Sequence, residues 1–195
     1  MSTLESLKDK YFFVVDLEPC YDFAVAMAEK LHNDKKDAPN HRIFNNDYYL
    51  VGILGEITYS MILHEKFDST LYIKSGDSGE DFKDTQIKAT EERKLKKIPY
   101  LIEYRHKKTI AKNYVMSAVN LQKKHGFIVG WVWRFKFEKE SKILDFGYGP
   151  RKTMHIDKLN PIWTYPPIVD RALEIVRRNY YRGDSNSWKA QGITP

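Results

Sequence analysis

Residues 75–90 read SGDSGEDFKDTQIKAT, and this stretch decides the centre of the fold. Its first part is acidic and contains two glycines, and its end, TQIKAT, alternates polar and apolar residues. That alternation is typical of a half-buried β-strand, in which alternate side chains share a face. We therefore expect Gln86 and Lys88 to project together from one face, with Ile87 and Ala89 directed into the core.

The residues just before this strand, EDFKDT, are short and polar, which predicts a tight turn. Asp81 then lies on the preceding strand, where it can come opposite the face that carries Gln86 and Lys88. A carboxylate, an amide oxygen and an ammonium group are therefore predicted to converge.

Asp77 is the alternative to Asp81 as the carboxylate of this group, because the spacing from Asp81 to Gln86 is short. We favour Asp81, since it adjoins Phe82 in a strand-like pair and leaves SGDSGE as the turn. The remaining carboxylates of the stretch, Glu80 and Asp84, are interpreted as turn residues.

This grouping suits a divalent metal ion. Mg²⁺ prefers hard oxygen ligands and keeps several waters, so Asp81, the side-chain oxygen of Gln86 and the main-chain carbonyl of Ile87 can serve as its ligands. Such an ion polarises a phosphodiester oxygen and lowers the pKa of a bound water. Lys88 can orient or deprotonate that water, or neutralise charge that develops on the phosphate.

A further ligand can come from the apolar segment YYLVGILGEITYSMIL, which predicts a helix over roughly residues 47–64. Gly52 and Gly55 each cost about 1 kcal/mol of helix stability relative to alanine. Close packing against a sheet would explain both glycines and would carry Glu56 to the metal site. The alternative is that Glu56 is a surface residue of an amphipathic helix.

The composition describes a folded globular chain. It has 195 residues, 42% of them hydrophobic, which fits one domain over residues 1–195. Its apolar runs are too short to cross a bilayer, and its single cysteine excludes an intramolecular disulfide framework. We expect a cytoplasmic protein without a membrane partner.

Positive charge is concentrated in one window. Residues 88–112 contain nine Lys or Arg against three Asp or Glu, an excess of six that equals the net charge of the whole chain, +6. A basic segment beside a carboxylate cluster suits a polyanionic partner such as DNA. The alternative is a solvated helix or loop. The residues predicted to contact the DNA backbone are Lys94, Lys96, Lys97, Arg105, Lys107 and Lys108.

The other segments complete the predicted fold class. Residues 100–106, 114–121 and 126–137 are rich in aromatic and branched residues and indicate strands. Phe23, Met27 and Leu31 recur every fourth residue and mark a helix face, and residues 165–181 form another helical pattern. The prediction is an α/β fold with a central mixed sheet flanked by helices.

The order of these motifs resembles the PD-(D/E)XK nuclease superfamily, in its phage and restriction-endonuclease-like branch. The resemblance is carried by GILGE on a helix, then GEDF, QIKAT and IVGW on strands, and later HIDKLNPIW. It implies a restriction-endonuclease-like core over roughly residues 45–165, an N-terminal extension at 1–44, and a C-terminal helix and tail at 166–195. It also implies a Mg²⁺- or Mn²⁺-dependent DNA endonuclease in which Asp81, Gln86 and Glu56 hold the metal and Lys88 assists the attack of water.

Two residues depart from the pattern of this superfamily. No proline precedes the aspartate, and Gln86 stands where a glutamate is usual. The rival hypothesis is therefore a catalytically inactive or partner-dependent DNA-binding protein on the same fold. Cutting both strands from one site per chain usually requires a homodimer, and the expected setting is a bacterial, archaeal or phage-infected cell.

Overall fold

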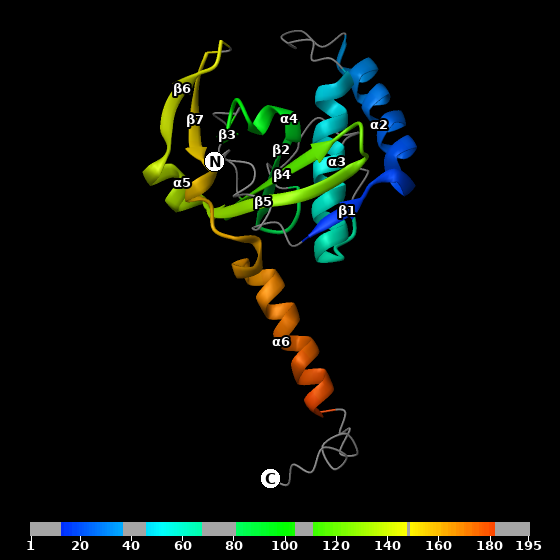
Figure 1. The fold of residues 1–195 in the computed structure, drawn as a ribbon, viewed down its shortest axis with the longest axis vertical. Helices are drawn as coiled ribbons and strands as arrows, with labels where there is room; N and C mark the ends of the chain where they lie inside the picture. Colours follow the sequence, from blue (N-terminus) through cyan, green and yellow to red (C-terminus); the bar gives the residue numbers. More distant parts are fainter. Residues whose placement is uncertain (1–12, 37–45, 68–80, 104–110, 148, 182–195) are drawn as a thin grey trace. The chain divides into compact units, whose positions relative to one another are not determined.

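The computed structural model describes residues 13–36, 46–67, 81–103, 111–147 and 149–181. The chain divides into two compact units, Met1–Pro161 and Ile162–Pro195. The first unit is a mixed α/β structure in which helices flank a mixed sheet, as the sequence predicts (Figure 1). The second unit contains a short 3-10 helix, η2 (Ile162–Thr164), and the predicted C-terminal helix α6 (Pro166–Tyr181).

The main sheet has four strands in the order β1-β5-β4-β2. β2 and β4 run parallel, whereas β4 with β5 and β5 with β1 are antiparallel, so the sheet is mixed. β2 is the predicted TQIKAT strand, and it occupies one edge of the sheet. The bounds are β1 (Val14–Asp16), β2 (Thr85–Glu91), β4 (Asn113–Asn120) and β5 (His125–Trp133).

A second sheet has three antiparallel strands in the order β3-β7-β6. Only its first strand lies within a segment predicted as β, because the other two contain charged residues and a proline. The strands are β3 (Tyr100–Glu103), β6 (Lys142–Asp145) and β7 (Pro150–His155). The short helical segments of this unit are α4 (Glu92–Leu95), α5 (Arg134–Glu140) and η1 (Ile156–Lys158).

Two apolar cores cover the two faces of the four-stranded sheet. One lies under α2 (Glu18–Lys36) and α3 (Asn46–Leu63), which lie side by side (Figure 1). The other includes residues of both sheets and of α4 and α5. β4 shows the division, because Val119 belongs to the first core while Tyr114, Met116 and Ala118 belong to the second. Burial on both faces explains the continuous apolar run of this strand.

Two sequence predictions about faces and ends were wrong in part. On the predicted face of α2, Leu31 is buried and Met27 is half-buried against the first core, but Phe23 is 49% exposed. Ala24 and Ala28 of this helix are also buried. The strand predicted over residues 126–137 ends at Trp133, because the residues after it coil into α5.

No helix among the residues described is long and apolar enough to span a membrane. The longest described helices, α2 and α3, instead bury residues in the first core.

Candidate functional site

The expected turn before β2 is present and is tightly defined. Phe82 and Thr85 form an isolated bridge, with the Thr85 N–H donating to the Phe82 carbonyl over 2.9 Å and the Phe82 N–H donating back over 3.1 Å. Between them, Asp84 takes a left-handed backbone conformation with φ +58°, which aspartate tolerates better than most residues. The Asp84 carbonyl accepts from the backbone N–H groups of Lys112 and Asn113, so the turn is tied to the start of β4.

Asp81 is held directly against β2. Its carboxylate Oδ2 accepts a hydrogen bond from the backbone N–H of Ile87 over 2.6 Å, and its own N–H donates to the Thr85 carbonyl. In a strand, the N–H and C=O of one residue point to the same side. The Ile87 carbonyl therefore lies on the same edge of β2 as the N–H that Asp81 binds, which brings two predicted oxygen ligands to one edge.

The predicted separation of faces along β2 is found in the structure. Ala89 lies against α3, so Ile87 shares that face, and Gln86 and Lys88 project from the opposite one. Gln86 is only 9% exposed, and Lys88 is half-buried. An amide and an ammonium group thus share the face of the sheet that carries the second core.

Glu56 is positioned by the packing of α3 on β2. A side chain at Gly55 would place its Cβ 2.4 Å from the Ala89 Cβ, so the close approach requires glycine. One turn later, the Tyr59 ring lies 4.6 Å from that of Phe82, measured between centroids. Half-buried Glu56 lies between these two contacts along α3. The helix therefore crosses β2, on the face opposite to the Gln86 and Lys88 side chains.

The packing argument applies to only one of the two glycines. Among the described residues, no atom lies within 4 Å of the position that a Cβ on Gly52 would take, so close packing is not found there. Gly52 lies almost one turn before Gly55.

The predicted donor set consists of oxygen atoms: a carboxylate and a main-chain carbonyl on the edge of β2, an amide on its face, and a carboxylate on α3. Hard oxygen donors of this kind fit Mg²⁺, which completes its coordination with waters. The hydrogen bond from the Ile87 N–H does not exclude metal binding by Asp81, because a carboxylate has about four acceptor positions. Among the described residues, no group of three or more His, Cys, Asp or Glu side chains gathers into a site. Asp77 and Glu80 lie outside the described residues.

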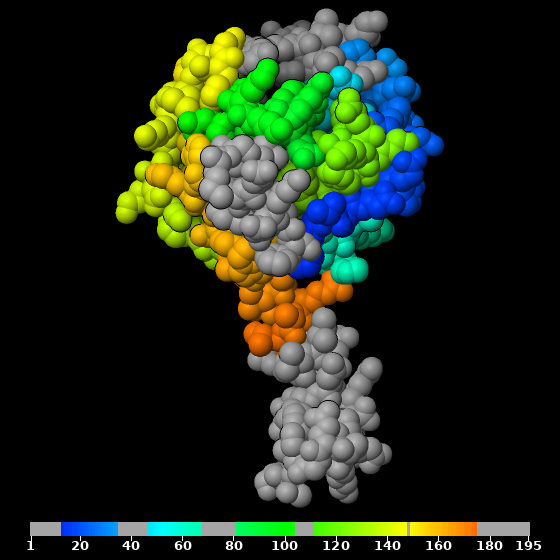
Figure 2. Space-filling model, viewed as in Figure 1, coloured from blue at the N-terminus to red at the C-terminus, as the bar shows by residue number. Residues whose placement is uncertain are grey.

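The predicted DNA-contacting residues are placed in part. Lys96 and Lys97 are exposed just after α4, where the green segment reaches the surface in Figure 2. Lys94 is exposed but forms an ion pair with Glu91 over 2.5 Å. Three of the predicted residues lie outside the described part of the chain, namely Arg105, Lys107 and Lys108.

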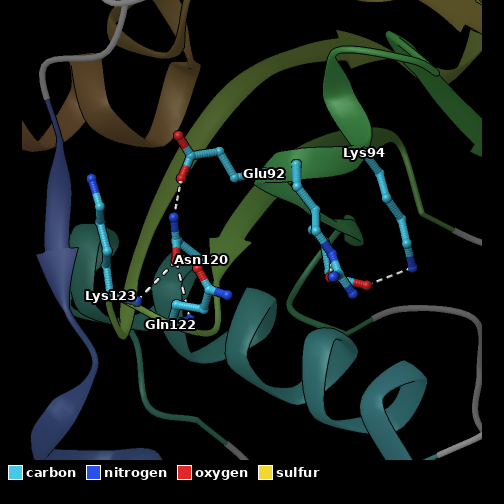
Figure 3. Close-up of polar contacts among 7 residues, drawn as sticks. Glu92, Lys94, Asn120, Gln122 and Lys123 are labelled. Atoms are coloured by element: carbon cyan, nitrogen blue, oxygen red, sulfur yellow. Dashed lines mark hydrogen bonds and ion pairs between the residues drawn. The ribbon is translucent and has the colours of Figure 1, made fainter.

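α4 is anchored at the carboxyl ends of the parallel strands. Its Leu95 is buried, and its Glu92 accepts from the Asn120 side chain over 2.7 Å (Figure 3). Glu92 also contacts His125 Nε2 at 3.2 Å. Asn120 in turn accepts from the backbone N–H groups that begin the turn to β5. These contacts hold the basic segment in a fixed place at the end of β2.

Glu91 is a buried carboxylate at the same end of β2. Burial by itself raises its pKa, but the hydrogen bonds and charges of Lys94 and Arg93 outweigh that effect, so the pKa is lowered. Both cations are largely exposed, whereas the Glu91 side chain is only 6% exposed.

Three residues near the candidate site were not predicted from the sequence as part of it, namely Lys112, Tyr114 and Glu103. Lys112 forms an ion pair with Asp84 over 3.0 Å, and its carbonyl accepts from the backbone N–H of Arg134. Tyr114 and Glu103 lie on the Lys88 face, where the Tyr114 hydroxyl donates to Glu103 over 2.6 Å. Only strand pairing between distant segments brings these residues together, so no local pattern identifies them.

No protein-family model, no curated protein and no solved structure matches this chain. The comparisons therefore provide no evidence for or against the resemblance.

Proposed function

We propose that this chain is a Mg²⁺-dependent DNA endonuclease that hydrolyses phosphodiester bonds through a PD-(D/E)XK-type site on a restriction-endonuclease-like core. The hydrogen bond from the Ile87 N–H to Asp81 carries the proposal. It fixes a carboxylate at the edge of the strand whose adjacent face presents Gln86 and half-buried Lys88. A carboxylate, an amide and a lysine held on one rigid element suit metal-assisted phosphoryl transfer.

In this proposal the ion lies at the edge of β2, where Asp81 and the Ile87 carbonyl would hold it together with the Gln86 side-chain oxygen from one face and Glu56 from the other. When bound, Mg²⁺ or Mn²⁺ supplies a Lewis acid that polarises a phosphodiester oxygen and lowers the pKa of a coordinated water. The Lys88 ammonium orients the attacking water or neutralises negative charge that develops on the phosphate. Asp81 also holds the β2 edge in place through its bond to Ile87.

DNA binding is assigned to the basic segment around α4. Lys96 and Lys97 are exposed, and Lys94 forms an ion pair with Glu91. A phosphate group can compete for the exposed Lys94 ammonium, because Glu91 keeps its second ion pair, with Arg93. Each lysine that contacts a phosphate adds about 0.9 to the slope of log affinity against log salt concentration, which gives a direct measure of these contacts. A homodimer would bring two such sites to the two strands of a duplex.

A second candidate is a DNA-binding protein that does not cleave alone, because it is inactive or requires a partner. The amide at Gln86 favours it, since a neutral oxygen binds Mg²⁺ more weakly than a carboxylate. The lack of a group of three acidic or histidine side chains within the described residues favours it too. Titration calorimetry with Mn²⁺ separates the candidates: the nuclease binds Mn²⁺ and loses it on Asp81→Asn, whereas the second candidate shows no Asp81-dependent binding.

The enzyme proposal is tested by incubating the chain with supercoiled plasmid, linear duplex and branched DNA, each with Mg²⁺ and with EDTA. We expect cleavage of at least one substrate in Mg²⁺ and none in EDTA. Intact DNA in every Mg²⁺ reaction, with DNA binding retained, would support the second candidate.

A further inference from the structure

The ammonium group of Lys88 lies over an aromatic ring. Its Nζ is 5.9 Å from the centroid of the Tyr114 ring. β2 and β4 are parallel, and Gln86 pairs with Tyr114 while Lys88 pairs with Met116, so all four residues belong to one face of the sheet. A cation within about 6 Å of a ring centroid is attracted by the electron-rich ring face.

The Tyr114 ring itself is fixed by burial and by contacts with two other side chains. It is fully buried, and the Phe137 ring meets it at 5.1 Å with an interplanar angle of 64°. Its hydroxyl donates to Glu103 Oε1 over 2.6 Å, which links β4 to β3 of the second sheet. Burial and this hydrogen bond raise the pKa of Tyr114, so the hydroxyl stays protonated and remains a donor.

A lysine side chain has four rotatable carbon–carbon bonds, so its ammonium group can take many positions. A rigid ring beside it restricts where the ammonium group can lie, and the placement of a reacting group within about 1 Å can change a rate by about 100-fold. We propose that Tyr114 is a positioning residue whose ring, held by Phe137 and Glu103, keeps the Lys88 ammonium on the Gln86 face of β2. The contact between Lys88 and the Tyr114 ring is seen in the structure. Its effect on catalysis rests on the proposed nuclease function.

The alternative role for Tyr114 is that of an ordinary core residue. In that case its replacement would act only through stability, as the replacement of any other aromatic residue of the same core does. Phe127 is the matched control, because it is buried in the same cluster but lies on β5, opposite Ala118. Tyr114→Phe retains the ring without the hydroxyl, and Tyr114→Leu removes the ring.

The first test is NMR of the protein with ¹³C-labelled lysine side chains, in which the Lys88 signal is assigned from its loss in Lys88→Arg. We expect the Lys88 ε-protons of the wild type to resonate upfield of those of exposed lysines such as Lys96, because they lie over the ring. Tyr114→Phe and Phe127→Leu should keep this shift, and Tyr114→Leu should abolish it. A wild-type Lys88 signal at the position of exposed lysines would overturn the proposal, even if Tyr114→Leu does not fold.

The second test is kinetic and is made well below the unfolding temperature of each variant. We expect Tyr114→Leu to lower kcat about 10- to 100-fold with KM for DNA unchanged, and Tyr114→Phe to lower it less than 3-fold. Equal losses in Tyr114→Leu and Phe127→Leu would contradict a positioning role. A wild type that shifts the Lys88 signal but cleaves no DNA would contradict the nuclease function and leave the lysine–ring contact supported.

Discussion

Gly55 of α3 lies directly against Ala89 of β2, at a distance where any Cβ on the glycine would fall 2.4 Å from that of the alanine. The Ser117 Oγ of β4 lies equally close to the same point, at 2.5 Å. Real Cβ atoms do not approach other atoms this closely, so the helix can occupy this place only with glycine at that position. The contact fixes the height of α3 over β2, and with it the place of Glu56.

The two glycines of α3 therefore give opposite predictions. Gly55→Ala should lower the free energy of unfolding by about 1–3 kcal/mol, because it forces extra volume into a packed contact. Gly52→Ala should raise it by up to about 1 kcal/mol, because the position is open and alanine is the better helix former. Urea denaturation of both variants measures the difference.

The cause of the first effect can be checked with a second substitution. Ala89→Gly removes the nearest atom, so it should restore part of the stability lost in Gly55→Ala. The restoration should be incomplete, because Ser117 remains close. Equal stabilisation by both single glycine substitutions would show that helix propensity and not packing controls this face of α3.

Gln86 gives a prediction about the metal. Gln86→Glu places a carboxylate at a position that is only 9% exposed, which should lower the melting temperature in EDTA, because a buried charge without a partner is costly. Mg²⁺ should restore stability, by about 2.7 kcal/mol when its concentration is 100 times its dissociation constant. Scanning fluorimetry across a Mg²⁺ series measures both effects.

The control for this substitution is Gln122→Glu, which makes the same chemical change at an exposed position of the turn after β4. Its melting temperature should be insensitive to Mg²⁺. If Gln86→Glu is also insensitive to Mg²⁺, residue 86 is not a metal ligand.

Glu91 gives a prediction about pH. Its pKa in the folded state is lowered, so the unfolded chain binds a proton first as the pH falls. The stabilisation from Glu91 is therefore complete above about pH 5 and is lost as the pH falls through the folded-state pKa. Glu91→Gln should reduce the acid-induced loss of stability by about 1 kcal/mol, a modest value because Arg93 and Lys94 are exposed.

Urea titrations of wild type and Glu91→Gln at pH 6 and pH 3 measure this difference. Glu140→Gln, at the exposed end of α5, serves as the control and should behave as the wild type does. A Glu91→Gln variant with an unchanged acid dependence would show that the two ion pairs do not contribute to folding.

Local sequence patterns predicted the helices and strands in which buried residues recur at a regular spacing. The alternation of TQIKAT gave β2 and its two faces, and the apolar run after Asn46 gave α3. The same rule failed at Arg134, because the segment that follows β5 continues to alternate as a strand does. In the structure Phe135 is 71% exposed and Phe137 is fully buried, which the coiling of α5 explains.

The candidate site also contains residues that a local pattern can group and residues that only the whole fold brings together. Asp81, Gln86 and Lys88 lie within eight residues of one another, so a turn and a strand were enough to predict their grouping. Tyr114 meets Lys88 only through the parallel pairing of β2 with β4, and Glu103 meets Tyr114 only through the packing of a second sheet. Pairing of this kind depends on the whole fold and leaves no mark in the local sequence.

The central claim is that the Asp81 carboxylate is part of a metal-dependent active site. Asp81→Asn and Asp84→Asn make the same change three residues apart in one turn, but only the first alters the carboxylate that binds β2 at Ile87. The most direct measurement is the rate at which each variant nicks or cuts supercoiled plasmid in Mg²⁺. We expect at least a 100-fold loss for Asp81→Asn and a rate close to that of the wild type for Asp84→Asn. Equal rates for wild type and Asp81→Asn would contradict the central claim.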